Sequence, residues 1–118
     1  MLPLALCACM SDMFHYSQVS IVNTTNTPVF FCNRTEIDQC KFNTDEISTG
    51  HAKHILFDTK IIDIQRSLDW VSLKICDDVI PMNRIVEISP PVRKRSAYPE
   101  EFEVEISPRV IDAFCAKK

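Results

Sequence analysis

Hydrophobic and polar residues alternate most clearly in two segments of the chain, residues 85–88 and residues 102–106. Alternation with a period of two is typical of a β-strand that buries one of its faces. Each segment is followed by a Ser-Pro pair, which is expected to end the strand. The residues predicted to face the interior are Val86, Ile88, Phe102, Val104 and Ile106.

Shorter apolar runs predict further strands in the first half of the chain. Residues 19–22 and 29–32 are separated by a polar turn-forming cluster, so residues 18–33 are predicted to form a hairpin-like pair. Residues 37–42 carry a weaker strand pattern, and another strand is expected to begin at residues 55–57. Several short strands at near-regular spacing predict a two-layer β-sandwich.

Residues 60–76 fit both a helical and a strand pattern. The last part alternates as a strand would, whereas five apolar residues recur at helical spacing: Ile61, Ile64, Leu68, Val71 and Ile75. The content of β-branched residues favours two strands joined by residues 66–69. Trp70, flanked by apolar residues, is interpreted as a core residue.

A single glycine, Gly50, among 118 residues limits the chemistry that the chain can carry. Phosphate-binding loops, dinucleotide fingerprints and nucleophile elbows need glycines at fixed spacings, so those families are excluded. The length suits one domain. We expect an apolar N-terminal segment and lead-in over residues 1–17 and a single β-rich domain over residues 18–118. The predicted fold class is mainly β, an immunoglobulin-like β-sandwich with a short helix after Pro108.

The charge balance argues against nucleic acid and anionic membranes as partners, because the formal net charge is -3. The densest basic cluster is Arg93, Lys94 and Arg95, within a segment, residues 90–101, that contains three prolines. We interpret this segment as an exposed loop rather than a phosphate-binding patch. The three basic residues and Tyr98 form a candidate partner-contact loop.

The N-terminal residues and the sequons bear on the compartment. Residues 1–10 resemble the hydrophobic part of a signal peptide, although no Lys or Arg precedes them, and they are too short to span a bilayer. Residues 6–9 resemble a lipoprotein processing site, which makes Cys9 a candidate lipid anchor. Sequons make Asn23 and Asn33 candidate glycosylation sites. These features favour secretion or the cell envelope over the cytoplasm.

Six cysteines permit three disulfides in fifteen pairings, and the spacing selects none of them. Cys32 and Cys76 lie in apolar strand-like runs, where a free buried cysteine is ordinary. The histidines His51 and His54 lie three residues apart, but the paired ligand spacing of a structural zinc site is absent from the sequence. Asp77 and the aspartate after it are interpreted as a polar turn. We therefore predict no catalytic, cofactor or metal residues.

Residues 18–57 resemble the early strands of PapD-like immunoglobulin-type sandwiches such as major sperm protein domains. The matching features are a strand that ends in Asn, a partner strand, and a turn with glycine before the next strand. They are carried by Asn23, Val29, Phe30, Phe31, Thr35, Phe42, Ile47, Gly50, Ile55, Leu56 and Phe57. The proline usually found beside the turn glycine is missing, which leaves the family's ligand site unsupported. The resemblance implies a binding or structural module, not an enzyme.

The first functional hypothesis is a non-catalytic interaction module, a structural or adaptor subunit of a larger protein assembly. It would contact protein partners through exposed strand edges or through the loop at residues 90–101. One alternative is a secreted or viral disulfide-bonded glycoprotein that binds a host receptor or ligand. Two others are a small envelope lipoprotein and a small enzyme or metal protein that uses Cys and His.

Overall fold

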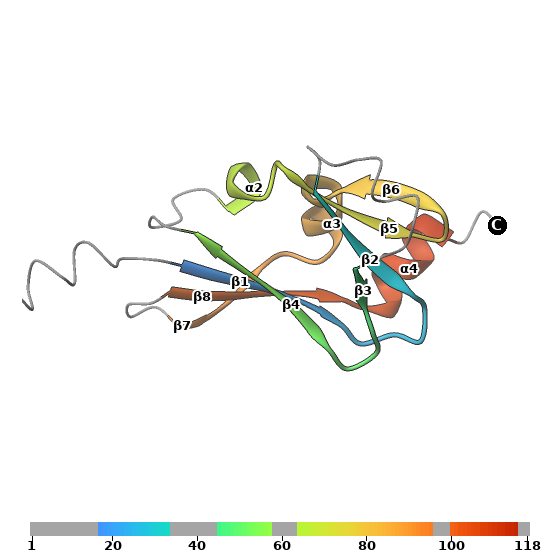
Figure 1. Cartoon of the computed structure of the whole chain (residues 1–118), viewed down its shortest axis with the longest axis horizontal. Helices are drawn as coiled ribbons and strands as arrows, with labels where there is room; N and C mark the ends of the chain where they lie inside the picture. The colour runs from blue at the N-terminus through green and yellow to red at the C-terminus, as the bar shows by residue number, and fades with distance from the viewer. Residues whose placement is uncertain (1–16, 34–44, 58–63, 96–99, 116–118) are drawn as a thin grey trace, which may run out of the picture.

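Two four-stranded sheets pack against each other in the computed structural model, which describes residues 17–33, 45–57, 64–95 and 100–115 (Figure 1). The first sheet has the order β4-β1-β8-β7. Its strands are β1 (Ser17–Asn23), β4 (Ala52–Phe57), β7 (Val92–Arg95) and β8 (Glu100–Ile106). The second sheet has the order β3-β2-β5-β6. Its strands are β2 (Val29–Asn33), β3 (Glu46–Ile47), β5 (Val71–Ile75) and β6 (Asp78–Pro81).

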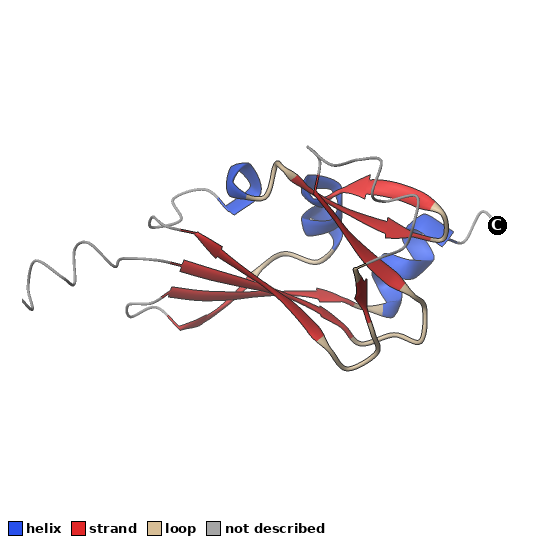
Figure 2. Ribbon diagram, in the orientation of Figure 1, coloured by secondary structure: helices blue, strands red, loops and turns tan. Residues whose placement is uncertain are grey.

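Strands β1 and β8 run parallel to each other, and the other pairs in both sheets are antiparallel. Three helices accompany the sheets in the described part of the chain: α2 (Ile64–Ser67), α3 (Met82–Ile88) and α4 (Pro108–Cys115) (Figure 2). The mainly β, two-sheet fold class is confirmed, as is the short helix after Pro108. The strand predicted over residues 37–42 lies outside the described residues, as do residues 1–16.

The core lies between the sheets, where the alternating residues of β1, β5 and β8 meet. Burial alternates along all of β1 and along β8, as a strand with one solvent-facing side requires. Apolar residues of both sheets and of helices α3 and α4 join one core cluster. The fully buried members include Val19, Ile21, Leu73, Ile75, Met82, Ile85, Val104, Ile106 and Val110. The inward positions predicted for residues 102–106 are confirmed.

The strand predicted over residues 85–88 is wrong, because this segment lies in helix α3. Met82, Ile85 and Val86 are buried and recur at the three-to-four-residue spacing of a helix, which outweighs a four-residue alternation. Pro81, with φ of -61°, precedes the helix. Its fixed φ is already close to the helical value and suits the start of a helix.

The hairpin-like pair predicted over residues 18–33 is also wrong, because β1 and β2 lie in different sheets. Both strands exist, but the turn between them carries the chain from one sheet to the other. Between the strands predicted in residues 60–76, residues 64–67 form helix α2, while the strand at 71–75 is confirmed. Trp70 is not a core residue, since 38% of its surface is exposed.

A two-residue turn, Cys76–Asp77, joins β5 to β6, with Ile75 opposite Asp78. Both turn residues have positive φ, 52° and 67°, which is the conformation of a type I′ hairpin turn. The turn expected at Asp77 is confirmed, but Asp78, which was expected in the same turn, begins β6, a strand that was not predicted. Glycine or asparagine usually supplies positive φ, so the sequence carried no strong signal for this turn.

Candidate functional site

The position of β4 is fixed by a corner where the chain crosses between the sheets twice. Asn23, at the end of β1, is fully buried there. Its Nδ2 donates to the carbonyl oxygens of Thr27 (3.0 Å) and Ile47 (2.9 Å), and its Oδ1 accepts from the backbone N–H and the hydroxyl of Thr25. Because one side chain holds both crossings, the corner sets where β4 starts.

Gly50 completes this corner immediately before β4. Its φ of 78° lies in the left-handed region that favours glycine. Its N–H donates to the carbonyl of Asn23 (2.8 Å), and the Asn23 N–H donates in turn to the carbonyl of His51 (3.1 Å). Thr49 Oγ1 adds a bond to the carbonyl of Thr25 (2.6 Å). These bonds place β4 at the edge of the first sheet.

Strand β4 pairs with β1 along one side, and no strand pairs with its other side within the described residues. The strand has six residues and contains no proline. Leu56, on the outer face, is 64% exposed. An unpaired edge of this length presents backbone N–H and C=O groups that another extended chain can bind.

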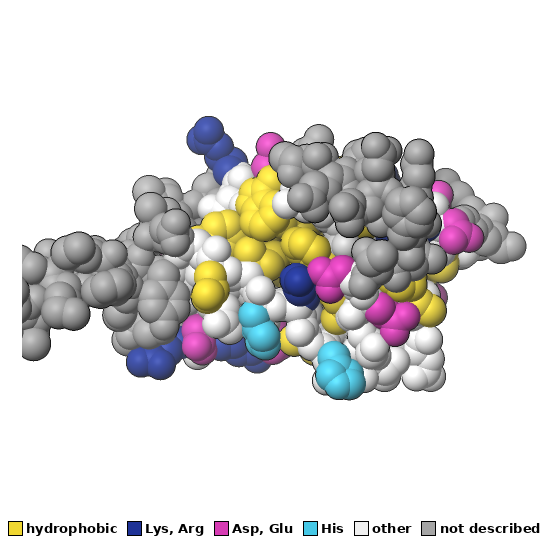
Figure 3. All heavy atoms as spheres, viewed as in Figure 1, with side chains coloured by type: hydrophobic (Ala, Val, Ile, Leu, Met, Phe, Trp, Pro, Cys, Tyr) yellow, Lys and Arg dark blue, Asp and Glu magenta, His cyan; other side chains and the backbone are white. Residues whose placement is uncertain are grey.

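Beside β4 lies an aromatic contact that includes the second sheet. The rings of Phe31 on β2 and Trp70 before β5 meet edge to face with centroids 6.3 Å apart. Lys53 Nζ on β4 lies 4.8 Å from the Phe31 ring and 2.8 Å from Asp45 Oδ2. Figure 3 shows hydrophobic side chains gathered on the face that carries β4 and β2. We call the edge strand β4 the β4 surface, together with Leu56 on its outer face and with Lys53, Phe31 and Trp70 on the side toward the second sheet.

The basic cluster occupies the opposite edge of the first sheet. Arg93, Lys94 and Arg95 belong to strand β7 rather than to a loop, and all residues of β7 are exposed. The exposure predicted for these three residues is confirmed, but the loop is wrong, because antiparallel pairing with β8 orders them. Tyr98 lies outside the described residues.

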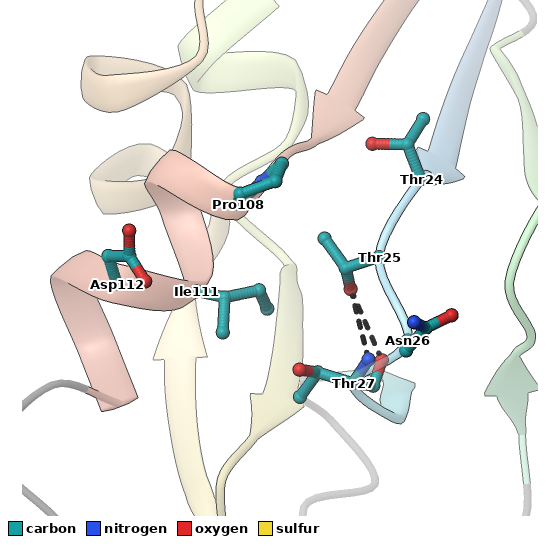
Figure 4. A pocket seen from close by; sticks show the side chains of 7 residues that line it. All are labelled: Thr24, Thr25, Asn26, Thr27, Pro108, Ile111 and Asp112. Atoms are coloured by element: carbon teal, nitrogen blue, oxygen red, sulfur yellow. Dashed lines mark hydrogen bonds between the residues drawn. The ribbon is translucent and has the colours of Figure 1, made fainter.

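A hollow of about 260 Å³ lies between the turn after β1 and the start of α4 (Figure 4). Its lining residues are Thr24, Thr25, Asn26, Thr27, Pro108, Ile111 and Asp112. Figure 4 shows Thr25 bonded to Thr27 across the turn. Thr24 Oγ1 donates to Glu105 Oε2 (3.0 Å). These hydroxyls stabilise the turn, and Asp112 is the single ionisable side chain in the lining.

The two histidines near β4 have separate partners. His54 Nδ1 shares a hydrogen bond with Ser20 Oγ (2.7 Å) on the outer face of the first sheet, and His51 Nδ1 donates to the carbonyl of Thr49 (3.2 Å). In hydrolases that use a serine nucleophile and a histidine base, hydrogen-bond donors that stabilise the oxyanion complete an enclosed site. This pair is exposed. Among the described residues no cluster of three or more His, Cys, Asp or Glu could hold a metal.

Cys76 and Cys115 form a disulfide that joins the β5–β6 turn to the last residue of α4. Cys32 is disulfide-bonded as well. The interpretation of Cys32 and Cys76 as free buried thiols is therefore wrong. Burial alone could not distinguish the two states, because apolar surroundings suit a half-cystine as well as a thiol. Cys9 lies outside the described residues.

The two sequon asparagines differ in access. The amide nitrogen of Asn23, to which a glycan would be attached, is buried and donates both of its hydrogen bonds within the corner. It is therefore not available for a glycan in the folded protein. Asn33, at the end of β2, is half-buried and remains the candidate glycosylation site. No described helix is long and apolar enough to cross a membrane.

No family model, curated protein or solved structure matches the chain. Arguments about function therefore depend on the geometry of the two sheets and their edges.

Proposed function

We propose that the protein is a non-catalytic interaction module, an adaptor or structural subunit, that binds an extended segment of a partner protein at β4. The observation that carries the proposal is the unpaired edge of this strand, with Leu56 64% exposed beside it. Strand addition satisfies the backbone groups of the edge, and side chains of the added strand supply specificity. The neighbouring aromatic contact supports a protein partner, because Trp and other aromatic residues dominate the binding energy of such interfaces.

The residues of β4 limit which segment would bind. Ala52, His54 and Leu56 share the outer face of the strand, since successive side chains point to opposite sides. A partner strand would place every second side chain beside this row. We expect an apolar residue next to Leu56 and a hydrogen-bonding residue next to His54, because cross-strand neighbours of matching chemistry stabilise a sheet.

Selection from a displayed library of random peptides, followed by hydrogen exchange, tests this proposal. The enriched peptides should alternate in polarity, and their binding should slow amide exchange in β4 more than in β7. Leu56→Lys should weaken their affinity by about tenfold, because it removes apolar contact area from the interface. The matched control Val79→Lys changes another exposed apolar residue, on β6, and should leave the affinity unchanged.

The proposal fails if no alternating peptide is enriched, or if the enriched peptides protect a surface away from β4. Methylation of alternate peptide backbone nitrogens is made in two sets, because only one set points toward β4 in a strand ladder. The proposal also fails if neither set of methylations weakens the affinity.

The disulfides favour a second candidate, a secreted protein whose surface binds a receptor or ligand. Disulfides persist mainly in oxidising compartments, and the three described cysteines are all bonded. Intact mass of the protein from its native source, with alkylation before and after reduction, tests this candidate. Labelling that appears only after reduction would support it, and labelling of Cys76 and Cys115 without reduction would contradict it. Loss of mass on deglycosylation would show that a glycan is attached, and we expect its site to be Asn33.

A further inference from the structure

The cationic edge of the first sheet, strand β7, already binds carboxylates that project from an extended strand. Arg93 Nη2 lies 3.5 Å from Glu100 Oε2, and Lys94 Nζ lies 3.6 Å from Glu103 Oε2. Both carboxylates belong to β8, the antiparallel neighbour of β7. Glu100 lies on the buried face of β8 and Glu103 on its outer face, so Arg93 and Lys94 bind carboxylates on opposite faces of an extended strand.

These ion pairs leave much of each cation accessible. The side chains of Arg93 and Lys94 are 54% and 52% exposed. The N–O separations are within ion-pair range but longer than the 2.7–2.9 Å or so of a strong charge-assisted hydrogen bond. The Lys94–Glu103 pair is exposed on both sides and contributes little to stability, so a carboxylate from outside can share Lys94. The Arg93–Glu100 pair is different, because the Glu100 side chain is only 5% exposed and Arg93 keeps that buried carboxylate paired, so it offers an outside carboxylate only its exposed part.

The outer side of β7 has the geometry to receive a strand. Within the described residues, no strand pairs with β7 on the side away from β8. The register shifts between Arg93 and Arg95, so Lys94 occupies an irregular position in the ladder. A bulge of this kind redirects side chains and twists an edge, which disfavours apolar strands. Opposite charges on a neighbouring strand would offset that effect.

We propose that β7 is a second docking surface, which binds an extended acidic segment of a partner protein through Arg93 and Lys94. The surface is distinct from the β4 surface, because β1 and β8 lie between the two edges. A module with one apolar edge and one cationic edge can hold two different segments at once.

Charge on the neighbouring strand argues for a single acidic peptide over a polyanion. Glu101, Glu103 and Glu105 alternate along β8 on the outer face of the same sheet. A nucleic acid or an anionic membrane is broad enough to face these glutamates as well as β7, and like charges would repel it. A peptide strand beside β7 meets the cations first.

Binding of a fluorescein-labelled peptide tests the proposal directly. The probe carries the sequence of residues 100–106, Glu-Glu-Phe-Glu-Val-Glu-Ile, because β7 pairs with this sequence in the fold. A matched probe has Gln in place of every Glu. Fluorescence anisotropy should show at least tenfold weaker binding of the Gln probe, and binding of the Glu probe should weaken steeply as salt rises.

Paired charge reversals locate the site on the protein. Lys94→Glu should weaken binding of the Glu probe by about tenfold or more, because it replaces an attraction with a repulsion. Arg109→Glu makes the same change of net charge at an exposed residue of α4 and should leave the affinity within about twofold. Thermal unfolding of both variants shows whether either change disturbs the fold.

Equal binding of the two probes, or equal effects of the two reversals, would overturn the proposal. Tighter binding to vesicles that contain phosphatidylserine, or to single-stranded RNA, with the same sensitivity to Lys94→Glu would also overturn it in favour of those anions. None of these outcomes bears on the β4 surface, which is tested by Leu56 and its own peptides.

Discussion

The two edges of the first sheet, β4 and β7, are built from different residues. Strand β4 has six residues with one basic side chain, Lys53, which is paired with Asp45, and with Leu56 exposed. Strand β7 has four residues, three of them basic, and its ladder contains an irregularity. Short length, charge and bulges are the features that keep an edge from pairing with other chains.

The difference shows that the two edges of one sheet can differ in how readily they pair with another chain. The β7 edge carries the ordinary protection against nonspecific pairing, and the β4 edge does not. An open apolar edge is an aggregation risk unless it has a partner. We therefore assign strand addition to β4 and restrict β7 to acidic segments.

The largest expected effect comes from breaking the corner that positions β4. Asn23→Ala should lower the free energy of unfolding by about 3 kcal/mol, because it leaves several buried backbone groups without hydrogen-bond partners. Urea denaturation measures this change. Hydrogen exchange, compared with the unsubstituted protein, should be accelerated more in β4 than in β7. The lost hydrogen bonds belong to the corner before β4 and make no contact with β7.

Asn26→Ala is the matched control for this change. Asn26 lies in the same turn but is exposed, so the free energy of unfolding should change by less than about 0.5 kcal/mol. If the two alanine variants were equally stable, the corner would not depend on the buried amide, and β4 would owe its position to strand pairing alone.

A smaller effect is expected from the turn that starts β4. Gly50→Ala should cost about 1 kcal/mol of unfolding free energy, because an L-residue is strained at a φ of 78°. Apart from Gly50 and its two chain neighbours, no residue has an atom within 4 Å of the added Cβ, so the expected cost comes from backbone conformation. Gly50→Asn should recover part of the loss, since Asn tolerates this region better. Equal stability of the Ala and Asn variants would contradict this explanation.

The sequence predicted the strands in which a local pattern and the tertiary structure agree. Alternation in β8 continues for its full length, and Val19 and Ile21 alternate with polar residues in β1. In α3 the two disagree, because Ile85 and Val86 fit a short strand until Met82 is counted with them. A longer window would have favoured the helix.

Other parts of the site depend on contacts between distant residues and could not be predicted locally. Strand β7 has one apolar residue, Val92, and becomes a strand by pairing with β8. The pairing of Cys76 with Cys115 spans 39 residues and was one of many combinations. Which strands form the edges follows from the whole strand order, so the β4 surface became visible only in the fold.

The smallest change in stability is expected from two substitutions, one that places a charge on β4 and one that removes a charge from β7. Leu56→Lys gives β4 a protecting charge, and Lys94→Leu removes one from β7. Because both side chains are exposed, each change should alter the unfolding free energy by less than about 0.5 kcal/mol. Sedimentation velocity over a range of concentrations should nevertheless separate the two variants. Leu56→Lys should lower self-association and Lys94→Leu should raise it, since the second variant weakens the protection of β7 while the β4 edge of the same sheet stays open. A shift in the same direction for both variants would show that the residues of β4 and β7 do not decide which edge is open, and the assignment of different partners to the two edges would lose its basis.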